Sequence, residues 1–259
     1  FNKEDYSQME EFDLNALGFT DVPSSYSMRK YAPIPKMQVG QSCVGFAMGY
    51  SAMSIHYNIE LGLTKPFEKT YFAFDPYFLY SLISSKYNVD CDEQTKPNDA
   101  LEVLENYGCK RMWTIPFLNC SSKVSNAAFP RAKPFRINDS FVISADVMKN
   151  KSQLISALKD LISHKIVPVA CIATSPSMAP SDVKNGAVGL NGLWRLSQYD
   201  KFEGAHAITI VGYSDYKYGG AFEIMNSWGS NYGDNGFMWI KYDDFIRVAL
   251  GIFILDSFK

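Results

Sequence analysis

Cys43 lies in the stretch QVGQSCVGFAM (residues 38–48), whose composition would suit a nucleophile. Gly40 and Ser42 favour a tight turn, and the apolar residues after Cys43 predict a mostly buried helix. Cys43 would then lie in the first turn of that helix, where free backbone N–H groups and the helix dipole favour an anion. A thiolate is such an anion and is the nucleophilic form of cysteine. The alternative is a small buried hydrophobic residue, and this stretch alone does not decide between the two.

A second stretch, residues 204–241, contains a histidine and an asparagine that could act with the cysteine. His206 begins an apolar, β-branched run that predicts a strand, and residues 214–220 predict a turn. Residues 221–225 predict a second strand, which ends at Asn226. A hairpin of this kind would bring His206 and Asn226 side by side.

Three pieces of the chain, SCVGFA, GAHAITIVGY and NSWGSNYGDNGFMWIK, occur in this order and resemble the papain-like cysteine peptidases. The resemblance implies that Cys43 is the nucleophile, His206 its general base and Asn226 the residue that orients the imidazole. It also implies that the side-chain amide of Gln38 binds the developing oxyanion. Trp228 would cover the bond between histidine and asparagine at the substrate site, although an indole that only fills the core is the alternative.

The chain departs from the family pattern at three places. Gln38 precedes Cys43 by five residues where most relatives have six, and Met37 occupies the usual position. Val44 replaces the aromatic residue that commonly follows the cysteine. Residues 96–98, Lys-Pro-Asn, replace a glycine pair that lines the substrate cleft in many relatives. We therefore expect backbone pairing with a substrate to differ here.

The fold that the resemblance implies is an α+β, papain-like fold with two lobes. A helical lobe at about residues 37–118 would pack on an antiparallel half-barrel lobe at about residues 119–259, with the active-site cleft between them. Together with an N-terminal arm, residues 1–36, they would form one catalytic domain over residues 1–259. The loop at residues 175–192 lies on the side of the cleft that helps to set specificity in the family.

Composition excludes several other classes of function. A net charge of −2 gives no electrostatic reason to expect binding to nucleic acid or to an anionic membrane. No apolar run is long enough to span a bilayer. The cysteines form no Cys-x-x-Cys pair and the three histidines lack ligand spacing, so we expect no metal site and no cofactor.

The cysteines also bear on the compartment. Cys171 lies in an apolar strand pattern and is expected to be an inert core thiol. By resemblance to the family, Cys91 and Cys120 are expected to form a disulfide, which would indicate an oxidising compartment. The chain begins at Phe1, which leads us to expect a processed form that has lost an export signal. Residues 1–22 could be the remainder of an inhibitory propeptide or an arm on the surface.

We therefore expect cysteine-dependent hydrolysis of a peptide or protein substrate through an acyl-enzyme, with an inhibitory propeptide as a further partner. Two alternatives remain at this stage. One is another acyl transferase that uses the same three residues, such as a transglutaminase-like enzyme. The other is a non-catalytic binding domain that has retained the fold.

Overall fold

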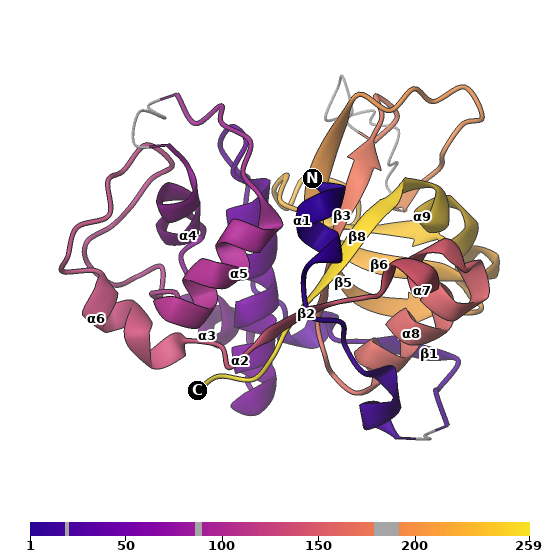
Figure 1. The fold of residues 1–259 in the computed structure, drawn as a ribbon, viewed down its shortest axis with the longest axis horizontal. Helices are drawn as coiled ribbons and strands as arrows, with labels where there is room; N and C mark the ends of the chain where they lie inside the picture. Colours follow the sequence, from indigo (N-terminus) through magenta and orange to yellow (C-terminus); the bar gives the residue numbers. More distant parts are fainter. Residues whose placement is uncertain (19–20, 86–89, 179–191) are drawn as a thin grey trace.

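A computed structural model describes residues 1–18, 21–85, 90–178 and 192–259. Helices gather in one half of the molecule and a large sheet forms the other half (Figure 1). This arrangement confirms the predicted α+β class with two lobes. No helix in the described ranges is long and apolar enough to cross a membrane.

The helical half is built around one buried helix that begins at Cys43. Its central segment, η3, has π-helical geometry, and all of its residues are buried. Two glycines let the neighbouring helix α4 approach it, since a Cβ on Gly45 would overlap the carbonyl oxygen of Pro76 and one on Gly49 would touch Leu79. The helical segments of this half are η3 (Gly45–Met53), α2 (Ser54–Glu60), α3 (Pro66–Tyr71), α4 (Pro76–Ile83), α5 (Pro97–Asn106), α6 (Phe129–Ala132) and η4 (Lys133–Phe135).

The segments α6 and η4 pack on the helical half, although they lie beyond residue 118, where the helical lobe is expected to end. The ring centroids of Phe129 and Phe78 of α4 are 5.9 Å apart, and those of Phe135 and Phe74 are 5.1 Å apart. These aromatic contacts extend the helical half beyond residue 118.

An ion pair is buried within the helical half. The side chains of Asp75 and Lys110 are 2% and 0% exposed, and Lys110 Nζ lies 2.7 Å from Asp75 Oδ2. Asp75 Oδ1 also caps α4, since it accepts hydrogen bonds from the backbone N–H groups of Tyr77 and Phe78. Lys110 Nζ donates at 2.9 Å to the carbonyl of Thr114. The pair thus joins the start of α4 to the segment that follows α5.

The sheet of the other half is open, because its path of paired strands ends at β2 on one side and at β4 on the other. Every pair is antiparallel except β4 with β7, which is parallel. In order across the sheet the strands are β2 (Ser140–Val142), β8 (Ala249–Leu255), β3 (Pro168–Thr174), β5 (Gly204–Ser214), β6 (Ala221–Met225), β7 (Phe237–Lys241) and β4 (Leu193–Trp194), and β1 (Ser25–Ser27) pairs with β5.

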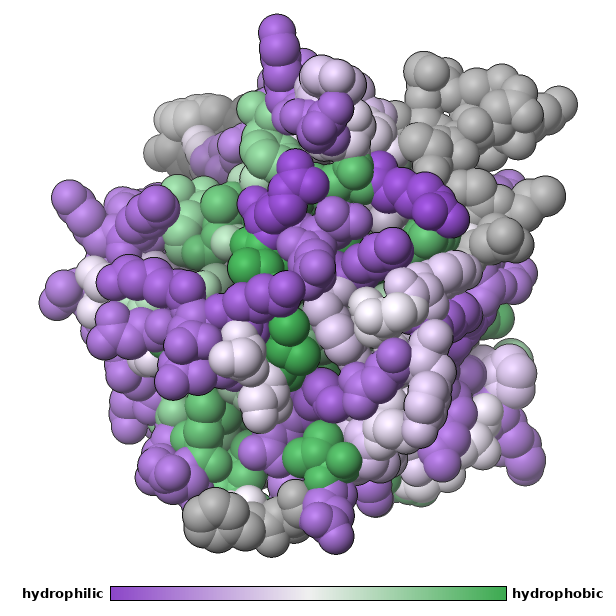
Figure 2. Space-filling model, turned by 90° about the vertical axis from the view of Figure 1, so that its right-hand side faces the viewer, coloured by the Kyte–Doolittle hydropathy of each residue, from purple (hydrophilic) through white to green (hydrophobic). Residues whose placement is uncertain are grey.

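Helices also cover part of the sheet (Figure 1). The longest, α8, buries residues at helical spacing, from Leu154 to Ile162, and Asn150 caps its start. The hydrophobic residues of the outer face of this lobe are scattered among hydrophilic ones (Figure 2). The remaining helical segments are α1 (Lys3–Ser7), η1 (Leu14–Leu17), η2 (Arg29–Tyr31), α7 (Ala145–Lys149), α8 (Lys151–Ser163), η5 (Lys217–Gly219) and α9 (Tyr242–Val248).

Candidate active site

Cys43 occupies the first turn of the buried helix, as its sequence context predicts. The hydroxyl of Ser42 donates a 2.8 Å hydrogen bond to the carbonyl of Val39, and the N–H of Phe46 donates to the carbonyl of Ser42. These bonds close the turn and begin the helix. The side chain of Cys43 is therefore held near the free N–H groups of a helix start while 8% of the residue remains exposed.

The turn before Cys43 is braced by the disulfide-bonded segment. Gly40 has a φ of +57°, and a Cβ at this position would overlap the carbonyl oxygen of Cys91. The N–H of Gln41 donates a 2.7 Å hydrogen bond to that same oxygen. Cys91 is bonded to Cys120, which confirms the expected pairing.

His206 and Asn226 meet across the predicted hairpin, which consists of β5 and β6. His206 Nε2 lies 2.8 Å from Asn226 Oδ1, and the two residues are 6% and 2% exposed. A carboxamide oxygen can only accept a hydrogen bond, so Nε2 must carry the proton. Asn226 Oδ1 also accepts from the N–H of Ser227 at 2.8 Å, which fixes the amide. The Nδ1 atom of His206 is therefore left for another partner.

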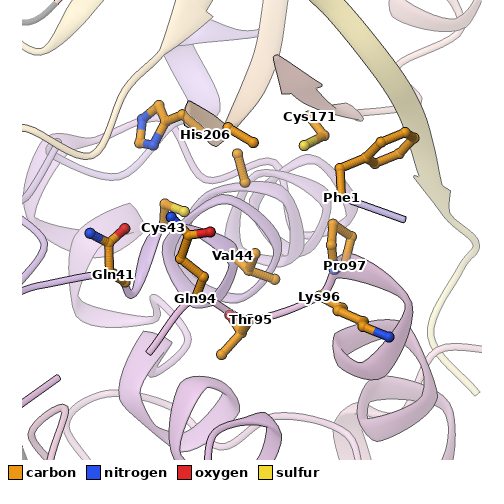
Figure 3. Close-up of a pocket in the computed structure, with 12 residues that line it drawn as sticks. Phe1, Gln41, Cys43, Val44, Gln94, Thr95, Lys96, Pro97, Cys171 and His206 are labelled. Atoms are coloured by element: carbon orange, nitrogen blue, oxygen red, sulfur yellow. The ribbon is translucent and has the colours of Figure 1, made fainter. Parts of the chain in front are cut away.

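That partner is Cys43, which lies across the cleft from His206 (Figure 3). Burial alone would raise the pKa of the Cys43 thiol, but a hydrogen bond with His206, the imidazolium charge and the N–H of Val44 hold the pKa below its usual value. Burial likewise opposes charge on His206, but the hydrogen bond and charge of Cys43 and the bond to Asn226 raise its pKa. The two shifts favour a thiolate–imidazolium pair.

The other free cysteines are in different environments. Cys171 lines the same cavity as Cys43, but burial raises the pKa of its thiol to about 12. Burial also raises the pKa of Cys109, whose Sγ donates to the carbonyl of Asp75 at 3.4 Å. A thiol with a raised pKa is protonated at neutral pH, so Cys43 is the thiol suited to nucleophilic attack.

One aromatic ring stacks on the histidine, and a second ring packs against the first. The ring of Trp228 stacks on His206 at a centroid distance of 5.0 Å and an interplanar angle of 28°. Tyr232 packs edge-on against Trp228, and its hydroxyl donates at 3.1 Å to the carbonyl of Met178. Tyr232 is a site residue that was not expected from the sequence, although it lies within the NSWGSNYG motif and its aromatic ring could have indicated a packing partner for Trp228.

Gln38 reaches the cleft despite its shorter spacing from Cys43. Its backbone N–H donates at 2.7 Å to the carbonyl of Ser227, and its Oε1 accepts at 2.6 Å from the hydroxyl of Ser227. Its Nε2 donates at 2.8 Å to the carbonyl of Gly40, which uses one of the two amide hydrogens. Gln38 lines a cavity together with His206 and Trp228.

A different segment forms the wall facing His206. Residues 94–97, Gln-Thr-Lys-Pro, line the cavity that contains Cys43 and His206 (Figure 3). Lys96 and Pro97 therefore stand beside the cleft. Most of the specificity loop expected at residues 175–192 lies outside the described residues. The described part of the chain contains no group of three or more His, Cys, Asp or Glu residues that could hold a metal ion.

Comparison with known proteins agrees with this geometry. The sequence profile of the papain family cysteine proteases matches residues 79–250, and the chain therefore belongs to this family. The matched range contains His206 and Asn226 and begins after Cys43, which the fold brings beside them. The chain is a papain-like thiol peptidase, and the activity of its family is cysteine-dependent peptide hydrolysis. No curated protein sequence matches it.

Solved structures of cysteine proteases share the fold. Xylellain, a cysteine protease from Xylella fastidiosa, is 20% identical with a TM-score of 0.70, over 97% of this chain and 92% of that chain. Procathepsin B from Trypanosoma congolense is 14% identical with a TM-score of 0.71, and the match covers 99% of this chain and 86% of that chain. The Carica candamarcensis cysteine protease CMS1MS2 is 18% identical with a TM-score of 0.58, and the match covers 92% of this chain and 100% of that chain. At these identities the likeness establishes the fold alone.

Proposed function

We propose that the chain hydrolyses peptide bonds through an acyl-enzyme formed on Cys43. The observation that carries this proposal is the chain of contacts from Cys43 to His206 to Asn226, with the pKa of the thiol lowered and that of the imidazole raised. In the first step the thiolate attacks the scissile carbonyl carbon, and the carbonyl oxygen becomes an oxyanion. The bond to the leaving nitrogen then breaks as His206 donates its proton to that nitrogen.

Hydrolysis of the acyl-enzyme completes the cycle. His206, now neutral, accepts a proton from water as the water attacks the thioester carbon, and Cys43 leaves as the thiolate. Asn226 keeps the imidazole oriented so that Nδ1 faces Cys43, and Trp228 shields the bond between histidine and asparagine from water. Gln38 Nε2 and the backbone N–H of Cys43 donate to the oxyanion in both steps.

The proposal also extends to the organisation of the chain and its location. Residues 1–259 act as one catalytic domain whose cleft lies between the lobes, with residues 1–36 as an N-terminal arm. The disulfide between Cys91 and Cys120 supports export to an oxidising compartment, because such bonds persist there. An inhibitory propeptide would fit the same cleft as a substrate.

Covalent labelling tests the proposed nucleophile. We expect a peptidyl epoxide to add one molecule to the wild-type chain at Cys43, as measured by intact mass and peptide mapping. Labelling should disappear in Cys43→Ala and fall strongly in His206→Ala, whereas Cys109→Ala should label like the wild type. Labelling that is indifferent to His206 would favour the non-catalytic alternative, whereas turnover in Cys43→Ala would contradict the covalent route.

A product assay separates hydrolysis from acyl transfer. Peptide cleavage in the presence of an added primary amine should give the free acid as the main product, which mass spectrometry identifies. A predominant amide product would instead support the transglutaminase-like alternative.

A further inference from the structure

A cavity of about 180 Å³ lies beside the nucleophile and the base. Its lining is mixed, since small apolar residues stand beside the polar side chains of Gln41, Gln94, Thr95 and Lys96. The apolar lining residues are Val44, Pro97, Cys171, Ala205 and Ala207. A cavity of this size and lining, adjacent to the reacting thiol, suits one apolar side chain of a bound peptide.

Phe1 of the N-terminal arm closes the end of this cavity that lies away from His206 (Figure 3). The helix α1 that follows it lies between the two halves of the molecule (Figure 1). From the sequence alone, residues 1–22 could be a surface segment or the remainder of a propeptide. In the structure it is a wall of the site.

The arm is anchored firmly on the strand-rich half. The ring centroids of Phe1 and Tyr6 are 5.4 Å apart, and Tyr6 is 6% exposed. The hydroxyl of Tyr6 lies 2.7 Å from the carbonyl oxygen of Ile143 and accepts a 3.1 Å hydrogen bond from the N–H of Ile252. Gly251 makes room for the arm, because a Cβ there would come within 2.6 Å of Phe1 and 2.8 Å of Tyr6.

The arm also contacts the helical half across the cleft. Lys96 Nζ lies 2.9 Å from Asp5 Oδ2, and Lys96 itself lines the cavity. Both side chains are substantially exposed, so this pair aligns the arm more than it stabilises the fold. The arm therefore bridges the two walls of the cleft at the closed end of the cavity.

We propose that residues 1–9 form the far wall of a specificity pocket and limit the size of the substrate side chain that enters beside the scissile bond. This inference rests on the proposed function, because the pocket is a substrate pocket only if Cys43 is the nucleophile. With the arm in place, the cavity of about 180 Å³ takes a side chain no larger than a single ring, such as Leu or Phe. Without it, the far end of the pocket is open and larger aromatic side chains fit.

The test compares cleavage of internally quenched peptides in which the residues on either side of the scissile bond are varied. Mass spectrometry locates the cleaved bond. The variants are a deletion of residues 1–9, which removes the wall, and Tyr6→Ala, which removes its anchor but keeps its length. Lys3→Ala is the matched control, since Lys3 lies in the arm and is exposed. Titration of Cys43 with the epoxide normalises every rate to the concentration of active enzyme.

We expect one substrate position to respond. There, the ratio of kcat/KM for Trp over Val should rise by about tenfold in the deletion and in Tyr6→Ala and should stay at the wild-type value in Lys3→Ala. An unchanged ratio in a variant that still titrates fully would overturn the proposal. A uniform increase for all peptides would also overturn it, because the arm would then obstruct the whole cleft. Failure of the wild type to titrate would instead contradict the proposed function.

Discussion

The carbonyl oxygen of Cys91 accepts a 2.7 Å hydrogen bond from the N–H of Gln41, two residues before the candidate nucleophile. The same oxygen lies where a side chain on Gly40 would have to stand. The turn that presents Cys43 is therefore shaped by a segment about fifty positions away in the chain.

Replacing Gly40 should disrupt this arrangement. In Gly40→Ala the new Cβ would overlap the Cys91 carbonyl, and the backbone would also be strained at a φ of +57°. The resulting shift of the turn should lower kcat/KM for a peptide substrate by about 100-fold. Gly62→Ala is a matched control, since Gly62 has a φ of +64° but no atom near a built Cβ. Equal activity of the two variants would refute this prediction.

The disulfide should contribute to stability through the loop that it closes. Cys91 and Cys120 are 29 positions apart, and a loop of this length corresponds to about 3–4 kcal/mol of unfolding free energy. The double variant Cys91→Ser/Cys120→Ser should therefore unfold at a lower urea concentration than the wild type, as followed by circular dichroism. A thiol reductant should lower the midpoint of the wild type and leave that of the variant unchanged. Coincident urea unfolding curves for the wild type and the double variant without reductant would contradict a stabilising role of the disulfide.

The rate of hydrolysis should depend on pH in a bell shape. The acid limb reports protonation of Cys43, whose pKa is lowered, and the alkaline limb reports loss of the proton from His206, whose pKa is raised. Activity is thus present between the two values and is lost as pH falls through the first or rises through the second. The measurement is kcat/KM against pH with a peptide substrate.

Asn226→Ala should move one limb of this profile. The hydrogen bond to Asn226 raises the pKa of His206, so its loss should shift the alkaline limb to lower pH. The maximal rate should also fall, because the imidazole is no longer oriented. A lower rate with an unmoved alkaline limb would mean that Asn226 supports the structure of the site but does not raise the pKa of His206.

The buried pair of Asp75 and Lys110 should be costly to break. Lys110→Met leaves the Asp75 carboxylate buried without its partner, which should destabilise the protein by about 3–5 kcal/mol in urea unfolding. Burial raises the pKa of Asp75, so the deficit should shrink as pH falls and the carboxyl takes up a proton.

Two variants control for this effect. The double variant Asp75→Asn/Lys110→Met should recover part of the loss, since it carries no buried charge. Lys149→Met removes a lysine from an ion pair that is exposed on both sides and should leave the unfolding midpoint unchanged. A midpoint for Lys110→Met equal to that of Lys149→Met would show that the buried pair contributes nothing to stability.

The hairpin was the part of the site that local sequence could predict best. An apolar, β-branched run marks β5 and a turn precedes β6, and the observed pairing of Thr209 with Met225 leaves Asn226 directly beyond the end of β6. The distance between His206 and Asn226 follows from that local geometry. The disulfide, by contrast, was expected from the family resemblance and not from the residues themselves.

The π-helical geometry of η3 was not predictable. The spacing of buried and exposed residues distinguishes a period of 3.6 residues from other periods. All nine residues of η3 are buried, so the sequence pattern does not show how many residues make one turn. The place of the arm was hidden for a different reason. Tyr6 is flanked by polar and charged residues at positions 2–5 and 7–8, and its partners, Ile143 and Ile252, are more than 130 positions away.

The candidate nucleophile and its base come from opposite halves of the molecule. Thr209, three residues after His206 on β5, donates a 2.9 Å hydrogen bond to the carbonyl of Ala47 in η3, across a separation of 162 positions. Until these distant segments dock, Cys43 has no imidazole beside it and its thiol keeps an ordinary pKa. A growing or half-folded chain therefore carries a Cys43 thiol that is mostly protonated at neutral pH, and the thiol becomes an activated nucleophile only when the fold is complete.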